Sequence, residues 1–244
     1  MGTARSDLWR GSVLSSMKHP RFFLVILPVL LLIAACAPPP ALRDDNLLKD
    51  RSLVTNQPCA APCFYGIVPG ETSWEDALTI IEDASNFRNL QTQTAEDGSG
   101  RVQAAWQDGE NGSICCQILS EDGQTVRLTF LRTAPLMTLG EVIEVHGEPT
   151  YLAGQEFTPD QAIISLVYPE LPMVVYVFVA GPETGELSAT SEIIGVLYFI
   201  QEDMDLLLQT TELHAWEGYQ SYTEYVEGEL EVTPSITLTP TPNQ

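Results

Sequence analysis

Two segments of the chain carry apolar residues at the spacing of an amphipathic helix. The first begins after Ser73, a residue type that caps helix N-termini, and its apolar face consists of Trp74, Ala77, Leu78 and Ile81. The second begins after Thr138, which forms a capping-box pair with Glu141. The apolar face of this second segment consists of Leu139, Val142, Ile143 and His146. The sequence therefore predicts two similar helices, and Gly147 ends the second.

Each predicted helix is followed by three runs of residues with the composition of β-strands. Turn residues such as Asp108-Gly109 and Gly181-Pro182 separate the runs. The predicted strands are 101–107, 113–119 and 125–131 in the first half and 162–168, 173–180 and 192–200 in the second. This order predicts an α+β fold of two tandem α-β-β-β units with antiparallel sheets, each with its helix on one face, plus a C-terminal aromatic segment.

The two predicted sheets differ in how their strands distribute apolar residues. Strands of the first half alternate apolar and polar residues, so one face of that sheet is expected to contact water. The runs 173–180 and 192–200 are apolar on both faces, so the second face needs a cover. We expect the C-terminal segment to supply it, with a partner protein as the alternative. The residues available for cover or interaction are Trp216, Tyr219 and Tyr222.

The N-terminus has the order of residues typical of a secretory signal. A basic segment precedes the uncharged residues 22–35, a run shorter than a transmembrane helix needs. It ends in Ile33-Ala34-Ala35-Cys36, which resembles the lipobox of bacterial lipoproteins. The resemblance implies that the signal peptide, residues 1–35, is removed and that Cys36 carries acyl chains such as palmitate, which place the protein on the extracytoplasmic face of a cell membrane. A membrane-spanning anchor is the alternative, and Met17 is a second candidate start.

The charge of the chain is strongly negative. The sequence has 11 Lys+Arg and 33 Asp+Glu, a net charge of −22, which argues against nucleic acid as a partner because phosphate contacts need clustered Lys and Arg. Removal of residues 1–35 takes away four basic side chains and one acidic one, which leaves a net charge of −25. Anionic head groups are expected to repel such a body.

Segments of different composition divide the exported chain. Residues 36–57, with three prolines near their start, are expected to form a flexible tether that lets the body stand off the membrane. The Thr/Pro-rich residues 233–244 are expected to form a disordered tail. The expected boundaries between them are 58–132 for the first repeat, 133–200 for the second, and 201–232 for a C-terminal segment that packs on the second repeat.

Four cysteines follow Cys36, and an exported protein is expected to use them in disulfide bonds. They are Cys59, Cys63, Cys115 and Cys116. Cys115 and Cys116 are adjacent in a predicted strand, so we expect their side chains on opposite faces. We therefore expect at least one bridge between the Cys59/Cys63 segment and this strand, stabilising the protein by about 2–4 kcal/mol. Thiol redox chemistry and metal binding are the alternatives.

Known catalytic patterns do not occur in the sequence. It has no nucleophile elbow, phosphate loop, metalloprotease motif or calcium loop. After Cys36 the only histidines are His146 and His214, neither in a metal-ligand motif, and we expect His146 to be a core residue. The sequence predicts no catalytic residue, no metal and no cofactor.

Short motifs around the helices resemble those of known families. Gly66–Gly70 before the first helix and Leu139–Pro149 at the second resemble patterns of the small BamE/SmpA-like lipoproteins, although the first helix lacks their Gly-x-Pro ending. The tandem arrangement resembles β-lactamase-inhibitor proteins, and Pro58–Gly66 resembles a segment of bacterial lipoproteins of unassigned function. The resemblance implies a non-enzymatic scaffold that binds proteins through a sheet face and its loops.

Taken with the charge and the N-terminus, these patterns predict a membrane-anchored lipoprotein of the cell envelope. We expect it to act as a non-catalytic protein-interaction or scaffold module with a protein partner of unknown identity. One alternative is a lipoprotein that binds a small ligand or cell-wall glycan through the C-terminal aromatic residues. The other is a hydrolase or redox enzyme without a recognisable motif.

Acylation of Cys36 is the direct test of the N-terminal prediction. Mass spectrometry of the protein extracted from membranes should find a chain that begins at Cys36 and carries the mass of acyl chains on that residue. The variant Cys36→Ser should lose the acyl mass, whereas the control Cys59→Ser should keep it. A terminus at residue 1 without acylation at Cys36 would contradict the prediction.

Overall fold

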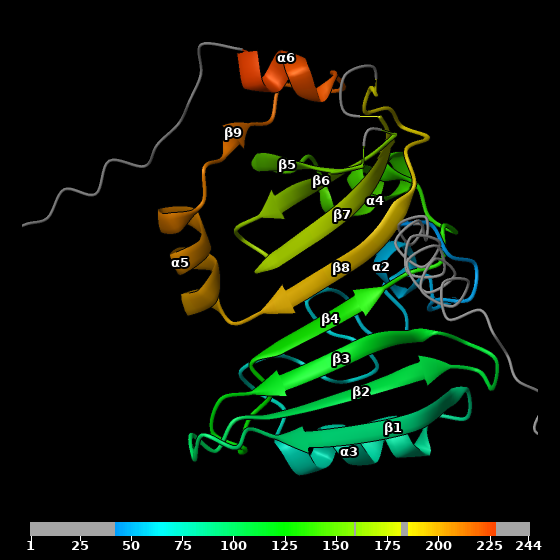
Figure 1. Cartoon of the computed structure of the whole chain (residues 1–244), viewed down its shortest axis with the longest axis vertical. Coiled ribbons are helices and arrows are strands. Elements are labelled where there is room, and N and C mark those ends of the chain that lie inside the picture. The colour runs from blue at the N-terminus through cyan, green and yellow to red at the C-terminus, as the bar shows by residue number, and fades with distance from the viewer. Residues whose placement is uncertain (1–41, 159, 182–184, 228–244) are drawn as a thin grey trace, which may run out of the picture. The chain divides into compact units, whose positions relative to one another are not determined.

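A single antiparallel sheet of nine strands runs through the part of the chain that the computed structural model describes, residues 42–158, 160–181 and 185–227. The strand order is β1-β2-β3-β4-β8-β7-β6-β5-β9 (Figure 1). The strands are Phe87–Thr94 (β1), Val102–Asp108 (β2), Ile114–Ser120 (β3), Leu128–Arg132 (β4), Tyr151–Thr158 (β5), Gln161–Tyr168 (β6), Met173–Ala180 (β7), Ile193–Phe199 (β8) and His214–Ala215 (β9).

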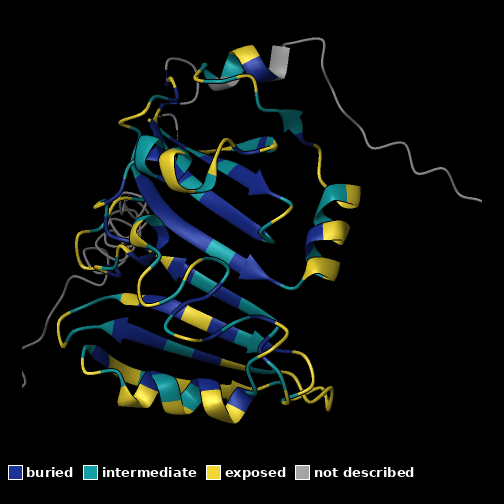
Figure 2. Ribbon diagram, turned by 180° about the vertical axis from the view of Figure 1, so that it is seen from behind, coloured by how far each residue is buried: buried dark blue, intermediate teal, exposed yellow. Residues whose placement is uncertain are grey.

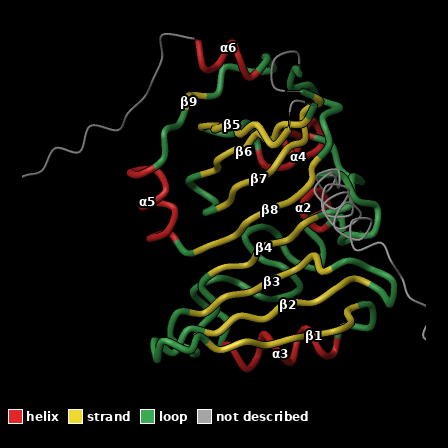
Figure 3. The backbone as a smooth tube through the Cα atoms, in the orientation of Figure 1, coloured by secondary structure: helices red, strands yellow, loops and turns green. Residues whose placement is uncertain are grey.

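The described residues also form five helices, shown with the strands in Figure 3. They are Ser52–Thr55 (α2), Trp74–Asp83 (α3), Leu139–His146 (α4), Gln201–Thr210 (α5) and Tyr222–Glu227 (α6). The helices α3 and α4 lie on the same face of the sheet, the face that Figure 2 shows in front. That face is therefore the covered face, and the opposite one is called the open face below.

Both helices predicted from the apolar period are confirmed. The Ser73 hydroxyl accepts a hydrogen bond from the backbone N–H of Asp76 at 3.1 Å and caps α3. Thr138 and Glu141 form the capping box of α4, and the helix ends at Gly147. The helix residues buried against the sheet are Trp74, Ala77, Ile81, Leu139 and Val142. The six predicted strands are also present, with ends that differ by up to three residues.

The predicted α+β fold with two α-β-β-β units is wrong. The structure contains one sheet, and each of the helices α3 and α4 is followed by four strands. Three strands are additional to the six predicted ones: β1, β5 and the two-residue β9. β1 and β5 have the sequences FRNLQTQT and YLAGQEFT, and most of their side chains are exposed or half-buried. Strands near the edge of a sheet pack against few neighbours and therefore carry few apolar residues. A prediction based on alternating apolar residues does not identify such strands.

The two halves join through strands β4 and β8. These pair antiparallel over five residues, from Leu128 opposite Phe199 to Arg132 opposite Gly195. Gly195 permits close approach there, because a Cβ atom at this position would lie 3.0 Å from the carbonyl oxygen of Leu131. The alternation of apolar and polar residues along a strand indicates which of its faces is buried, but it does not indicate which strand lies beside it. The pairing of β4 with β8 is therefore not predictable from the apolar pattern.

Residues 42–57, predicted as part of a flexible tether, are instead folded along the body. The side chains of Leu47 and Leu48 are each 1% exposed. The backbone N–H of Leu48 donates to the carbonyl of Arg132 at 3.2 Å, and the N–H of Ala134 donates to the carbonyl of Leu48 at 2.9 Å. We call residues 42–57 the N-terminal strap. The signal peptide 1–35, the tether residues 36–41 and the tail 233–244 lie outside the described residues.

Two apolar clusters hold the sheet. The larger lies on the covered face and includes Trp106, Ile118 and Leu139 together with the strap leucines. The smaller lies on the open face, where Met204 and Leu213 pack against Val167, Val174 and Phe199. The covered face therefore forms the core, and α5 covers only part of the other face.

The strap can be tested by two neighbouring substitutions. Leu48→Ala should lower the free energy of unfolding by about 2–5 kcal/mol, because it empties a fully buried site. Lys49→Ala removes an exposed side chain and should change stability by less than about 0.5 kcal/mol. Denaturant unfolding measures both values. Equal, small effects would show that the strap does not contribute to the core.

Candidate functional site

The open face of the sheet carries apolar side chains on five neighbouring strands, β4, β8, β7, β6 and β5. Alternate residues along each strand point to this face, because neighbouring residues of a strand point to opposite sides. Those that remain half-buried rather than buried are Leu128, Phe130, Ala153, Ile163, Tyr176, Phe178 and Leu197. We call these seven residues the apolar patch.

An aromatic pair lies at the centre of the apolar patch. The rings of Phe130 on β4 and Tyr176 on β7 meet edge to face, with centroids 5.9 Å apart and an angle of 84° between their planes. The intervening strand β8 contributes Gly195 opposite Tyr176, so no side chain separates the two rings. Burial raises the pKa of the Tyr176 hydroxyl, which therefore stays neutral at physiological pH.

On β1 to β3 the open face is mostly polar, as the alternation predicted. Gln93, Gln103 and Gln117 are exposed there, and the amide of Gln103 donates to the side-chain oxygen of Gln93 at 2.8 Å. On β4 the predicted faces are reversed, because Leu128 and Phe130 lie on the open face and Thr129 is buried. Gln117 lies directly opposite Phe130 in the β3–β4 pair. The boundary between the polar and apolar halves therefore runs between β3 and β4.

The C-terminal segment does cover part of the open face, but with α5 rather than with the predicted aromatic residues. Met204, Leu207 and Leu208 of α5 pack on the open face, together with Leu213. Their spacing of i, i+3 and i+4 is the signal that could have identified α5 as the cover. Leu128, Ala153, Tyr176 and Leu197 of the apolar patch belong to the same cluster. The other patch residues, Phe130, Ile163 and Phe178, are not part of it.

The aromatic residues predicted to cover the open face lie elsewhere. Trp216 packs against the main core and stacks on Tyr225, with ring centroids 6.3 Å apart. Tyr219 meets Trp216 edge-on at 5.9 Å and is 47% exposed. The structure does not describe the side chain of Tyr222. This aromatic group extends the core beside β9 and leaves the open face to α5.

A cleft of about 760 Å³ lies where β4 begins and β8 ends. Four segments surround it: the loop around 62–71, the turn between β3 and β4, the turn between β6 and β7, and the end of β8 with the start of α5. Its apolar lining includes Pro62, Val68, Pro172, Phe199 and Ile200, and its acidic lining consists of Glu71, Glu121, Asp122 and Glu202. No sequence motif marks this cleft, because its walls come together only when the two halves pair.

Two charged side chains that line the cleft, Arg127 and Asp122, are bound by neighbouring groups. The Arg127 guanidinium donates to both carboxylate oxygens of Asp203, at 2.8 and 2.5 Å, and this hydrogen bonding raises the pKa of Arg127. The backbone N–H of Gln124 and the Ser120 hydroxyl bind the Asp122 carboxylate and lower its pKa. The arrangement stabilises charged forms and suits binding better than proton transfer.

The disulfide bridges differ from the predicted pairing. Cys59 bonds to Cys63, with Cα atoms 5.7 Å apart, and Cys115 bonds to its neighbour Cys116. The expected bridge between the two segments is therefore wrong. The register of β2 with β3 shifts between Trp106 and Gln107, so Cys115 is the extra residue of a bulge and is buried like Cys116. The bulge interrupts the alternation on which the prediction relied.

The remaining predicted groups are placed as follows. The ring Nε2 of His146 donates to the carbonyl oxygen of Leu53 in the strap at 2.6 Å, which accounts for this half-buried histidine.

Among the described residues no group of three or more His, Cys, Asp or Glu side chains is arranged to hold a metal ion. None of the helices in the same residues is long and apolar enough to span a membrane. Cys36 lies outside the described residues.

Comparison of the chain with protein-family models, with curated proteins and with solved structures finds no match. The resemblances to lipoproteins and inhibitor proteins therefore stay predictions, and the function has to be argued from the surfaces described above.

The disulfide pairing can be tested by digestion with trypsin without reduction. Cleavage after Arg51, Arg88, Arg101 and Arg127 places each bonded pair within one peptide, 52–88 or 102–127. Each peptide should therefore appear about 2 Da below its reduced mass, the two hydrogens lost when a disulfide forms. Reduction should restore that mass. A species joining the two peptides would contradict the pairing.

Proposed function

We propose that this protein is a membrane-anchored extracytoplasmic lipoprotein that acts as a non-catalytic protein-interaction module, with the apolar patch as its interface. The observation that supports the interface is the patch itself. Its seven half-buried apolar residues lie on five neighbouring strands of one sheet face, with the polar Ser165 between Ala153 and Tyr176. Apolar side chains gathered on a sheet face that is only partly covered favour a contact site.

The composition of the patch also favours a protein partner. Its centre is the Phe130–Tyr176 pair, and large aromatic side chains contribute most of the binding energy in protein interfaces. The exposed Gln117 on β3 lies beside Phe130 of the patch, which gives a polar residue at the rim of an apolar centre, as in such interfaces. The strands that carry the patch are paired on both sides, so the surface is rigid before binding.

The proposed location rests on the order of residues at the N-terminus. A basic segment, an apolar run and the ending Ile33-Ala34-Ala35-Cys36 are typical of a signal that is cut before an acylated cysteine. Lipid on Cys36 would hold the body at a membrane surface without a spanning helix. The non-catalytic role agrees with the cleft, where the side chains of Arg127 and Asp203 bind each other.

A second candidate function is the binding of a small ligand in the cleft. Its volume of about 760 Å³ lies within the range of ligand pockets, and its lining combines apolar and charged side chains. The aromatic residues first considered for this role, Trp216 and Tyr219, pack on each other at the β9 side of the core. The cleft is thus the better place for a ligand, and the patch is the better place for a protein.

The interface can be tested with two facing substitutions. Phe130→Glu places a charge at the centre of the patch, whereas Gln117→Glu places the same charge on the opposing residue of the polar half. Cross-linking and capture from envelope extracts, followed by affinity measurement, should show binding about tenfold or more weaker for Phe130→Glu. Gln117→Glu should bind like the parent.

Two controls make this result interpretable. Circular dichroism and thermal unfolding should show that both variants fold, and Leu197→Ser offers a milder change in the same patch. A partner whose binding is unaffected by Phe130→Glu and Leu197→Ser would exclude the patch as the interface. Binding of a small molecule lost on substitution in the cleft would support the second candidate.

A further inference from the structure

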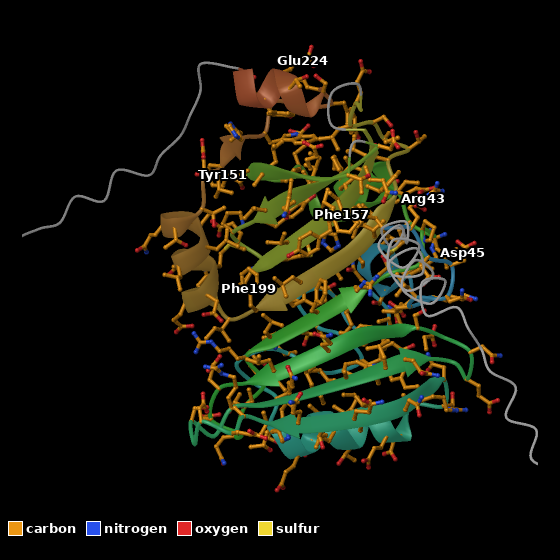
Figure 4. The ribbon with its side chains drawn as sticks, in the orientation of Figure 1. Arg43, Asp45, Tyr151, Phe157, Phe199 and Glu224 are labelled. Atoms are coloured by element: carbon orange, nitrogen blue, oxygen red, sulfur yellow. A yellow bond between two sulfur atoms is a disulfide. The ribbon has the colours of Figure 1, made fainter. Side chains whose placement is uncertain are left out.

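The strands divide the body into two ends with different surroundings. At one end the N-terminal strap begins: the N–H of Leu42 donates to the side chain of Gln161 at 3.2 Å, where β6 starts. Arg43 hydrogen-bonds Glu192 just before β8 and lies 5.5 Å from the ring of Phe178. The cleft lies at the other end. Figure 4 labels Arg43 and Phe157 at the first end and Tyr151 and Phe199 at the second.

The length of chain before the strap limits how far this end is from the lipid. Six peptide units join Cys36 to Leu42, and they span at most about 20 Å when fully extended. The strand β8 runs from the strap end to the cleft and covers roughly 23 Å. The strap end is therefore the part of the body that stays near a membrane surface, and the tether is much shorter than the predicted 36–57.

The strap end carries exposed apolar side chains along its margin. Ile114 at the start of β3 is 37% exposed, Leu136 after β4 is 47% exposed, and Phe157 near the end of β5 is 41% exposed. None of these three residues belongs to the apolar patch, so the interface proposed above does not account for them. We call them the apolar margin.

The basic residues of the body are also concentrated at the strap end. Of the seven Lys and Arg that follow Cys36, five belong to the strap or to the strand ends beside it: Arg43, Lys49, Arg51, Arg88 and Arg132. Several carboxylates at this end are already bound. Asp44 accepts from Ser113, Asp108 accepts from Asn86, and Arg51 donates to Glu141.

We propose that the apolar margin and the neighbouring basic side chains rest on the surface of the bilayer that holds the Cys36 lipid. The inference depends on the lipid anchor of the proposed function. The short tether keeps the apolar margin at a high effective concentration near the membrane. Contacts that are weak one by one are then sufficient to hold the margin on the bilayer surface. Arg43 and Arg51 are paired with Glu192 and Glu141, so Lys49, Arg88 and Arg132 are the basic side chains that would attract anionic head groups at this end. The strap end is therefore the membrane-facing end, and the cleft faces away.

Tryptophan scanning of the full lipidated protein tests this orientation. The variants Phe157→Trp and Leu136→Trp place a reporter in the margin, and the matched control Leu206→Trp places one on α5, where the replaced side chain is 56% exposed. Each protein is reconstituted in vesicles of phosphatidylcholine and phosphatidylglycerol with brominated acyl chains. Bromine quenches tryptophan only at close range, so the parent protein supplies the background from its own tryptophans.

Quenching should be several-fold stronger for the two margin variants than for Leu206→Trp. Equal quenching at all three positions, or none at any of them, would overturn the proposal while leaving the anchor in place. Co-flotation with the vesicles and the acyl mass on Cys36 are measured on the same samples. Absence of both would overturn the anchor of the proposed function and this inference together.

Discussion

The pairing of β4 with β8 is the interaction on which the rest of the structure depends. Five residue pairs join the four-stranded half β1–β4 to the five-stranded half β5–β9 in one sheet, and Gly195 permits the close approach. The pairing continues the apolar residues of β4 into those of β8 and β7, because Phe130 opposes Leu197, which in turn opposes Val174. It also brings the start of β4 beside the end of β8 and so creates the cleft. Both candidate surfaces therefore result from one strand pairing.

The N-terminal strap adds a constraint from outside the two halves. It joins the end of β4 through the backbone of Leu48 and the end of α4 through the hydrogen bond from His146 to Leu53. A segment that contacts both halves opposes their separation, because opening β4 from β8 would also expose its buried leucines. The strap thus fixes the point from which the N-terminal chain leaves the body.

Local features of this fold were predictable from the sequence, and long-range ones were not. Ser73 and Thr138 identified both helices because capping depends on residues three positions away. Strands β1 and β5 were not predicted, because many of their residues are polar. The buried strap was not predicted either, because Leu47 and Leu48 form too short an apolar run to indicate a buried segment. The disulfide pairing was mispredicted because a bulge at Cys115 interrupts the two-residue alternation of side chains along β3. The sequence indicated that strands of the second half are apolar on both faces. It did not indicate that α5 covers part of the open face.

The distribution of charge changes what the acidity of the chain means. The body is not uniformly acidic, because five of the seven cationic side chains stand at the strap end and the strap itself holds three basic and three acidic side chains. In the proposed orientation, a body resting on this end would hold the sheet upright on the bilayer, because the strands run from this end to the cleft. The open face would then point along the membrane plane rather than into it. Under the proposed function, the apolar patch would be presented to proteins held at the same membrane, and the cleft to molecules that arrive from the surrounding solution.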